Sequence, residues 1–335
     1  MRGCLGRMLL VATLAWSLHA QTAAYEERDV QFHSNRVTLA GTLVMPQSPG
    51  PHPAIVVLHG SGPATREGGV AYGREFAALG IATFAFDKRG CGRSGGDWTQ
   101  ASLDDLAADA SAAVAYLRTT AGIDAKRVGF FGVSQAAWVA TAAARPSNIA
   151  FMVLVSGGGA SPRESETYAY LTAFERAGLG AAEIAEAMRV IDRYMNYLAT
   201  GDGRDALVAE LNAAHDRAWS QLAPLERILP SPENRAHWQW VATWSPDDAI
   251  AHLTCPILLL FGDRDTEQPT AIAVARWREG LRRAGNTSYR IVVFPGAGHG
   301  IRMRDGFTGN GRAPFADGYE EVITGWLWRN VVTAK

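Results

Sequence analysis

A serine between an apolar run and a helical run is the residue of this sequence best suited to covalent catalysis. Ser134 lies in the segment Gly132-Val133-Ser134-Gln135-Ala136, after the run VGFFGV and before the Ala-rich run AAWVATAAA. A serine hydroxyl is a weak nucleophile, and a sharp turn at the end of a strand exposes its oxygen to a base. Small residues two positions before and after the serine let strand and helix pass closely. Taken alone, the pattern also fits an ordinary turn with an incidental serine.

A Gly-rich segment, His59-Gly60-Ser61-Gly62, directly follows an earlier apolar run and can present backbone N–H groups. The tetrahedral intermediate of acyl transfer needs two such donors, and one donor was worth about 2.7–4 kcal/mol where it was measured. We expect the two donors to be the backbone amides of Ser61 and Gln135. The segment also fits a tight turn that needs glycine for its backbone alone.

A carboxylate and an imidazole follow two later apolar runs. Asp265 ends the segment GDRD after ILLLF, and His299 lies in GAGHG after YRIVVF. Asp263 is the alternative acid, but we expect it to cap the turn. His252 precedes its strand and so belongs to the opposite edge of the sheet. Because the carboxyl ends of parallel strands share one edge, Ser134, Asp265 and His299 are expected to converge there.

The elements that must position these residues are short apolar runs separated by helical patterns. Continuous apolar runs are typical of strands buried on both faces of a parallel sheet. Residues 103–118 carry an amphipathic stripe, with Ser102 as N-cap and Asp105 completing a capping box. The alternation predicts an α/β fold, with a mostly parallel central sheet flanked by helices. Its strands are expected at 54–58, 81–86, 128–133, 149–156, 257–261 and 289–294, after a hairpin over 29–45.

Residues 161–250 break the alternation, because they contain no strand-like run. Three helical patterns fill most of this stretch, and Asp202 is expected to cap the third. Ninety residues are too many for an ordinary loop, so we interpret the stretch as a helical cap inserted into the core, which comprises 25–160 and 251–335. Aromatic residues are more often core than site, but Trp238, Trp240 and Trp244 are candidates for a substrate pocket because such pockets are mainly apolar.

The motifs together resemble those of α/β-hydrolase-superfamily serine hydrolases, and are similar to secreted bacterial esterases and serine aminopeptidase-like hydrolases. The segments that carry the resemblance are HGSG at 59–62, DKRGCGRS at 87–94, GVSQAAW at 132–138, GDRD at 262–265 and GAGHG at 296–300. It covers roughly 29–160 and 250–332 and leaves the cap unmatched. The usual G-x-S-x-G pattern ends here in Ala136, which puts the subfamily in question more than the chemistry.

The resemblance implies roles for three residues. Ser134 would be the nucleophile, His299 the general base and acid, and Asp265 the group that orients and stabilises the imidazolium. The implied activity is hydrolysis of a small-molecule carboxylic ester through an acyl-enzyme, with no cofactor and no metal. One alternative is a serine aminopeptidase acting on short peptides or amides, which needs an anchor for the substrate amine such as Glu164, Glu166 or Glu175. A less favoured alternative is a non-catalytic binding protein on a hydrolase scaffold.

Composition and the N-terminal segment indicate which partners and which cell compartment to expect. The sequence has 32 basic and 33 acidic residues among 335, and this balance argues against a nucleic-acid partner. Residues 1–20 have the charge, apolar run and small residues of a signal peptide, so we expect a secreted or periplasmic protein without stable membrane insertion after cleavage. Cys91 and Cys255 should lie at opposite sheet edges and stay unpaired. The scattered histidines show no metal-ligand spacing.

Overall fold

The computed structural model describes residues 25–304 and 312–334, and its centre is an eight-stranded sheet. The strand order is β1-β2-β4-β3-β5-β6-β7-β8. Strand β2 runs antiparallel to both β1 and β4, and all pairs from β4 to β8 are parallel. The predicted α/β fold is therefore confirmed. The strands are β1 (Tyr25–Ser34), β2 (Val37–Pro46), β3 (His52–Leu58), β4 (Ala82–Phe86), β5 (Ile123–Val133), β6 (Met152–Val155), β7 (Ile257–Gly262) and β8 (Tyr289–Phe294).

Helices cover both faces of the sheet, as expected when its strands are apolar on both sides. One apolar core joins the sheet to α2 (Leu103–Arg118), α3 (Ala136–Ser147) and α11 (Thr270–Arg283). A second core joins the opposite face to α1 (Glu67–Ala77) and α12 (Tyr319–Leu327). The outermost strand β1 is largely exposed and carries charged residues, a usual protection of a sheet edge against further pairing.

Helix α2 shows how local sequence fixes an element. It spans the predicted residues 103–118, and Ser102 and Asp105 form the predicted capping box. Such a cap contributes about 1 kcal/mol to helix stability. The helix is also tied to the loop after β4, because the buried Arg89 donates two hydrogen bonds to Asp109, at 2.7 and 2.8 Å. The turn after β4 is thus anchored to the helix layer.

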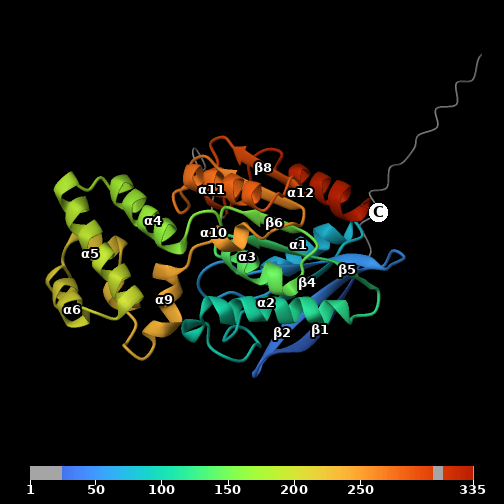
Figure 1. Ribbon diagram of the computed structural model, residues 1–335, viewed down its shortest axis with the longest axis horizontal. Coiled ribbons are helices and arrows are strands. Elements are labelled where there is room, and N and C mark those ends of the chain that lie inside the picture. The colour runs from blue at the N-terminus through green and yellow to red at the C-terminus, as the bar shows by residue number, and fades with distance from the viewer. Residues whose placement is uncertain (1–24, 305–311, 335) are drawn as a thin grey trace, which may run out of the picture.

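Between β6 and β7 the described chain contains helices only (Figure 1). The three expected helical patterns correspond to more numerous and shorter helices, because Pro224, Pro230, Pro232 and Pro246 interrupt the second half of the stretch. Asp202 was wrongly expected to be an N-cap: Gly203, with φ +74°, occupies that position. The helices are α4 (Pro162–Arg176), α5 (Ala181–Thr200), α6 (Arg204–Ala213), α7 (Ala218–Leu222), α8 (Leu225–Ile228), α9 (Arg235–Thr243) and α10 (Asp247–Ile250).

Most of these helices surround an apolar core of their own, built from residues of α4 to α8 and flanked by α9. Figure 1 shows α4, α5, α6 and α9 standing apart from the sheet, beyond one end of its strands. We call α4–α9 the cap. Helix α10 differs, because Ile250 belongs to the core on the sheet. The cap therefore has an interior that is separate from the two interiors of the sheet layers.

Two further expectations concern the termini and the cysteines. The predicted signal peptide, residues 1–20, lies outside the described residues. Within the described residues no helix has the length and apolar character to cross a bilayer. Cys91 and Cys255 are both free in the structure, and burial raises the pKa of the Cys255 thiol to about 12.

Candidate active site

Ser134 lies in a strained turn between β5 and α3. Its φ is +63°, a conformation that residues with a Cβ rarely adopt. The turn is held by Ser134 N, which donates to Val155 O at 2.9 Å in the adjacent strand. A Cβ on Gly132 would come within 2.4 Å of the Ala136 Cβ, so the helix packs directly on the strand. Alanine at position 136 is accommodated because position 132 is glycine.

Backbone from two neighbouring loops approaches this turn. A Cβ on Gly157, after β6, would lie 2.4 Å from Ser134 O, and one on Gly60, after β3, would lie 4.0 Å from the Ser134 Cβ. Ser61 therefore follows directly in the loop that borders the serine. Gln135 is the N-cap of α3, where the first backbone N–H groups of a helix have no partner within the helix. The predicted donor pair, Ser61 and Gln135, thus flanks Ser134 from two sides.

Lys88, which sequence analysis left unassigned, links these two loops. Its Nζ donates to Gly60 O at 2.8 Å, to Gly62 O at 2.9 Å and to Gln135 Oε1 at 3.0 Å. Burial lowers the pKa of Lys88 to about 8. All three ammonium protons point to fixed acceptors, so this side chain holds the loop after β3 against the start of α3. The only local signal was its place directly after the apolar strand β4.

Asp265 and His299 lie side by side at the ends of β7 and β8. His299 Nδ1 is 3.0 Å from Asp265 Oδ2 and 3.1 Å from Oδ1. The Asp265 side chain is buried, and its Oδ1 also accepts from the backbone N of Glu267 and Gln268. Although burial acts to lower it, the hydrogen bond and charge of Asp265, with the charge of Glu267, raise the pKa of His299.

The loop that carries His299 is fixed at both ends. Asp263, the rival acid, accepts from Gly296 N at 2.7 Å and so ties the loop after β8 to the end of β7. Gly300 N donates to Ser156 Oγ at 3.0 Å, beside the serine turn. Within the described residues no hydrogen bond joins Ser134 Oγ to His299. His299 Nε2 lies instead 3.4 Å from Glu267 Oε2. Catalytic hydrogen bonds are often long before substrate binds.

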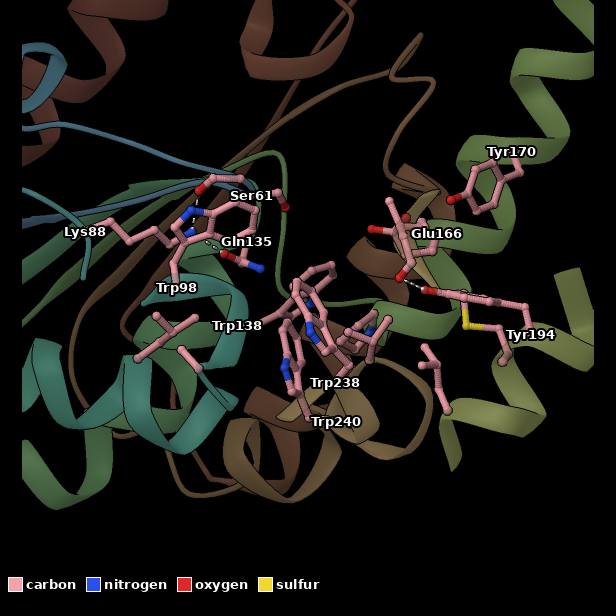
Figure 2. A pocket seen from close by; sticks show the side chains of 18 residues that line it. Ser61, Lys88, Trp98, Gln135, Trp138, Glu166, Tyr170, Tyr194, Trp238 and Trp240 are labelled. Carbon is pink, nitrogen blue, oxygen red and sulfur yellow. Dashed lines mark hydrogen bonds between the residues drawn. The ribbon is translucent and has the colours of Figure 1, made fainter. Parts of the chain in front are cut away.

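A cavity of about 130 Å³ opens between the sheet edge and the cap. Figure 2 shows Ser61, Lys88 and Gln135 on one side of it and Glu166, Tyr170 and Tyr194 on the other. Its remaining wall is mainly apolar and aromatic. Neither Ser134 nor His299 is among its lining residues, but the two flanking residues Ser61 and Gln135 are. The cavity therefore ends at the serine turn and extends from there into the cap.

The three candidate tryptophans are placed differently. Trp238 and Trp240 line the cavity, and they anchor α9: Trp238 Nε1 donates to Thr99 O at 2.9 Å, and Trp240 packs edge-on against Trp138. Trp244 does not line it. It follows the end of α9 with extended backbone, so it leaves the helical phase and packs against the core on the sheet. Trp98 and Trp138 line the cavity without having been singled out.

The three glutamates considered as amine anchors also differ. Glu164 is the N3 residue of the α4 capping box, and the hydrogen bond from Arg276 lowers its pKa to about 2. Glu175 is exposed on α4. Only Glu166 lines the cavity, where burial and the charge of Glu267 raise its pKa to about 6.

The described residues of this region offer neither a metal-binding cluster nor a free imidazole at His59. Among the described residues there is no group of three or more His, Cys, Asp or Glu side chains arranged to hold a metal ion. His59 precedes Gly60 in the loop that borders Ser134, but its Nε2 contacts Phe86 O at 2.5 Å. Burial lowers the pKa of His59 to about 4. His59 therefore supports the loop after β3.

Comparison with known proteins supports the same fold. The model of the alpha/beta hydrolase family matches residues 55–306, about three quarters of the chain. The chain belongs to the alpha/beta hydrolase family. Among solved structures it is similar to the Pyrococcus furiosus esterase Pf2001, with 17% identity over 92% of each chain and a TM-score of 0.61. It is also similar to Est1E from Butyrivibrio proteoclasticus, with 18% identity over 90% of this chain and 96% of that one and a TM-score of 0.56.

Two curated relatives of this hydrolase are more similar to it in sequence than these two solved structures are. The quorum-quenching protein AidA from Acinetobacter baumannii is 26% identical over 273 residues, 81% of this chain and 87% of AidA. Esterase EstD from Thermotoga maritima is 24% identical over 288 residues. The match covers 82% of this chain but 60% of EstD, so the chain spans less than two thirds of that relative.

Proposed function

We propose that this alpha/beta hydrolase is a serine hydrolase that cleaves carboxylic esters through an acyl-enzyme on Ser134. The observation that carries the proposal is the position of Ser134, at φ +63° between β5 and α3, near the loop that holds the His299–Asp265 pair. The esterases among its relatives and structural neighbours agree with this proposal. An ester is the substrate class because a mainly apolar cavity leads to the serine turn.

The mechanism assigns one role to each group. With Nδ1–H donating to Asp265, His299 Nε2 carries the lone pair that takes the proton of Ser134 Oγ. Ser134 Oγ then attacks the ester carbonyl, and the backbone N–H groups of Ser61 and Gln135 stabilise the oxyanion. His299 returns the proton to the leaving alcohol. Water enters, loses a proton to His299, and releases the acid from Ser134.

A single substitution tests this assignment. Ser134→Ala removes the nucleophile and should lower kcat/KM for p-nitrophenyl butyrate by about 10⁴-fold or more. Ser220→Ala, at a half-buried serine of the cap that does not line the cavity, is the matched control and should retain full activity. Circular dichroism checks that both variants fold. Persistent turnover by folded Ser134→Ala protein would exclude the acyl-enzyme.

A second measurement separates an enzyme from a binding protein on the same scaffold. A fluorophosphonate probe phosphonylates an activated serine and should label the wild-type protein once, with Ser134 identified by peptide mass spectrometry. The Ser134→Ala variant should remain unlabelled. Absence of labelling in wild-type protein would favour the non-catalytic reading.

We also propose that residues 1–20 direct the protein out of the cytoplasm, to the periplasm or the medium. The support is the sequence pattern alone: Arg2 and Arg7 precede an apolar run that ends before small residues. Expression of the full chain in a Gram-negative host, followed by fractionation and intact-mass measurement, tests it. Recovery of the protein from the cytoplasmic fraction, with a mass that still includes residues 1–20, would contradict this proposal.

A further inference from the structure

The cap presents one carboxylate to the cavity without a partner. In the part of the chain that the structure describes, the Glu166 carboxylate makes no hydrogen bond and no ion pair. A carboxylate beside an apolar wall loses hydration, and this loss is costly unless a cation or hydrogen-bond donor replaces the water. The wall of the cavity therefore contains an unused site for a positive charge.

The fold holds Glu166 in this position. Three side chains on the other face of α4 hold the loop that carries Asp265. Ser165 Oγ donates to Gln268 Oε1 at 3.0 Å, and Tyr168 OH donates to Asp265 O at 3.1 Å. Thr172 Oγ1 donates to Thr266 O at 2.6 Å. Glu166 and Tyr170, one helical turn apart, line the cavity instead. The same helix thus fixes the distance between the carboxylate and the loop of the catalytic acid.

Aromatic side chains surround the carboxylate. Tyr170 and Tyr194 line the cavity on the side of Glu166, as Figure 2 shows, and Trp238 and Trp240 line it between there and the serine turn. The face of an aromatic ring attracts a cation that lies within about 6 Å of the ring centre, and this attraction contributes about 0.5–2 kcal/mol. A carboxylate with nearby aromatic rings binds an ammonium group better than it binds an anion or a neutral polar group.

The two ends of the cavity also carry opposite charges. Lys88 lies at the end next to Ser61 and Gln135, and all its protons are already donated to protein acceptors. Glu166 lies at the other end, and the negative charge of Glu267 acts on it from the core side. This polarity favours a substrate whose carbonyl points to the serine turn and whose cationic group points to the cap.

We propose that the cavity is a subsite for esters that carry a protonated or quaternary amine, and that Glu166 is the residue that binds this cation. The proposal rests on the function proposed above, since the substrate must be an ester for the cavity to lead it to Ser134. The cationic group can belong to the acyl part or to the alcohol part. Both share the same chemistry at Glu166, and the substrates below distinguish them.

Binding is tested first, because it does not depend on turnover. Calorimetry at pH 8 measures n-hexyltrimethylammonium binding to wild-type protein, to Glu166→Gln and to the control Glu175→Gln, which lies on the same helix but is exposed. We expect the Kd to rise about tenfold in Glu166→Gln, as loss of a close charge partner predicts, and to stay unchanged in Glu175→Gln. Equal Kd values for wild type and Glu166→Gln would overturn the proposal.

Turnover measurements then show whether the preferred substrate carries its cation in the acyl part or in the alcohol part. Two pairs of isosteric esters are compared: ethyl 6-aminohexanoate with ethyl heptanoate, and 2-(trimethylammonio)ethyl hexanoate with 3,3-dimethylbutyl hexanoate. We expect the cationic member of one pair to have the higher kcat/KM, and the ratio to fall about tenfold in Glu166→Gln. A ratio that Glu166→Gln leaves unchanged in both pairs would overturn the subsite. If no ester is hydrolysed, the proposed function fails, while the binding result still decides the subsite.

Discussion

Polar groups at the carboxyl edge of the sheet and polar groups in the wall of the cap are satisfied in different ways. At the sheet edge, Lys88 donates three hydrogen bonds and Asp265 accepts from two backbone N–H groups beside His299. In the cap wall, Glu166 has no partner among the described residues. The supporting groups Lys88 and Asp265 are thus paired before substrate arrives, whereas the cap wall holds a carboxylate for which we propose a cationic ligand.

This difference separates two requirements of a hydrolase. Groups that stabilise a transition state work best when they are oriented in advance, because they then need no reorganisation during the reaction. A group that selects substrates contributes most when its partner comes with the substrate, since the wrong substrate leaves it unpaired. The predictions that follow test each side of the comparison, from the largest expected effect to the smallest.

The strongest test of the sheet edge compares two neighbouring aspartates. Asp265→Asn removes the charge beside His299 Nδ1 and should lower kcat by about 10⁴-fold, as amide replacement of a triad acid does. Asp263→Asn keeps an oxygen that can accept from Gly296 N and should retain at least about a third of the activity. Kinetics with p-nitrophenyl butyrate measure both. A larger loss in Asp263→Asn would make Asp263 the acid.

Replacing Lys88 tests whether activity requires the loop after β3 and the start of α3 to be held together before substrate binds. Lys88→Met leaves three buried acceptors without their donor, and it frees the loop after β3 from the start of α3. We expect kcat to fall about 10- to 100-fold, less than the loss of an oxyanion donor itself, with little change in KM. Lys126→Met, on the exposed surface, is the matched control. A change confined to KM would place Lys88 in substrate binding instead.

Glu267 lies between the two regions and should affect pH dependence more than rate. In the proposed mechanism neutral His299 is the base, so kcat/KM should fall as the pH drops through the His299 pKa, which lies above its usual value of 6.5. Glu267→Gln removes a negative charge 3.4 Å from Nε2 and should move this acidic limb to lower pH.

Glu279→Gln is the control for that prediction, because its side chain is 56% exposed, close to the 55% of Glu267, and it lies on α11. The pH profile of Glu279→Gln should match the wild type. An unchanged acidic limb in Glu267→Gln would show that the pairing with Glu267 does not persist in solution.

The sheet was predictable from sequence because its strands are buried on both faces. Such strands must be apolar along their whole length, so 54–58 and 257–261 were recognisable without any tertiary information, whereas 289–294 belong to β8, a partly exposed edge strand. Helix α2 was predictable to the residue because its capping box is local. The cap helices were not, since glycine both ends α5 and begins α6, and the acidic residue between the two glycines gave a false signal at Asp202.

The residues of the candidate site also differ in whether local sequence alone could predict them. Ser134 directly follows β5, and Asp265 and His299 lie in the loops after β7 and β8, so the rule that strand ends share one edge was enough to suggest them. The link made by Lys88 joins Gly60 to Gln135 across 75 positions, and no local pattern carries it. Trp244 was grouped with Trp238 and Trp240 by sequence distance, but it follows the end of α9 with extended backbone and does not line the cavity.

The separate apolar interior of the cap bears on how such enzymes diverge. Residues of α4 to α8 pack mainly on one another, while the sheet layers have two interiors of their own. Away from the α4 residues that clamp the Asp265 loop, substitutions inside the cap can therefore change the shape and charge of the cavity without loosening the packing beneath Ser134 and His299. A lineage can exchange one preferred substrate for another by mutation in this segment and inherit an intact reaction centre. In laboratory evolution, libraries restricted to 181–243, which spare the α4 side chains bonded to the Asp265 loop, should yield more folded variants with altered selectivity than libraries of equal size in the strands.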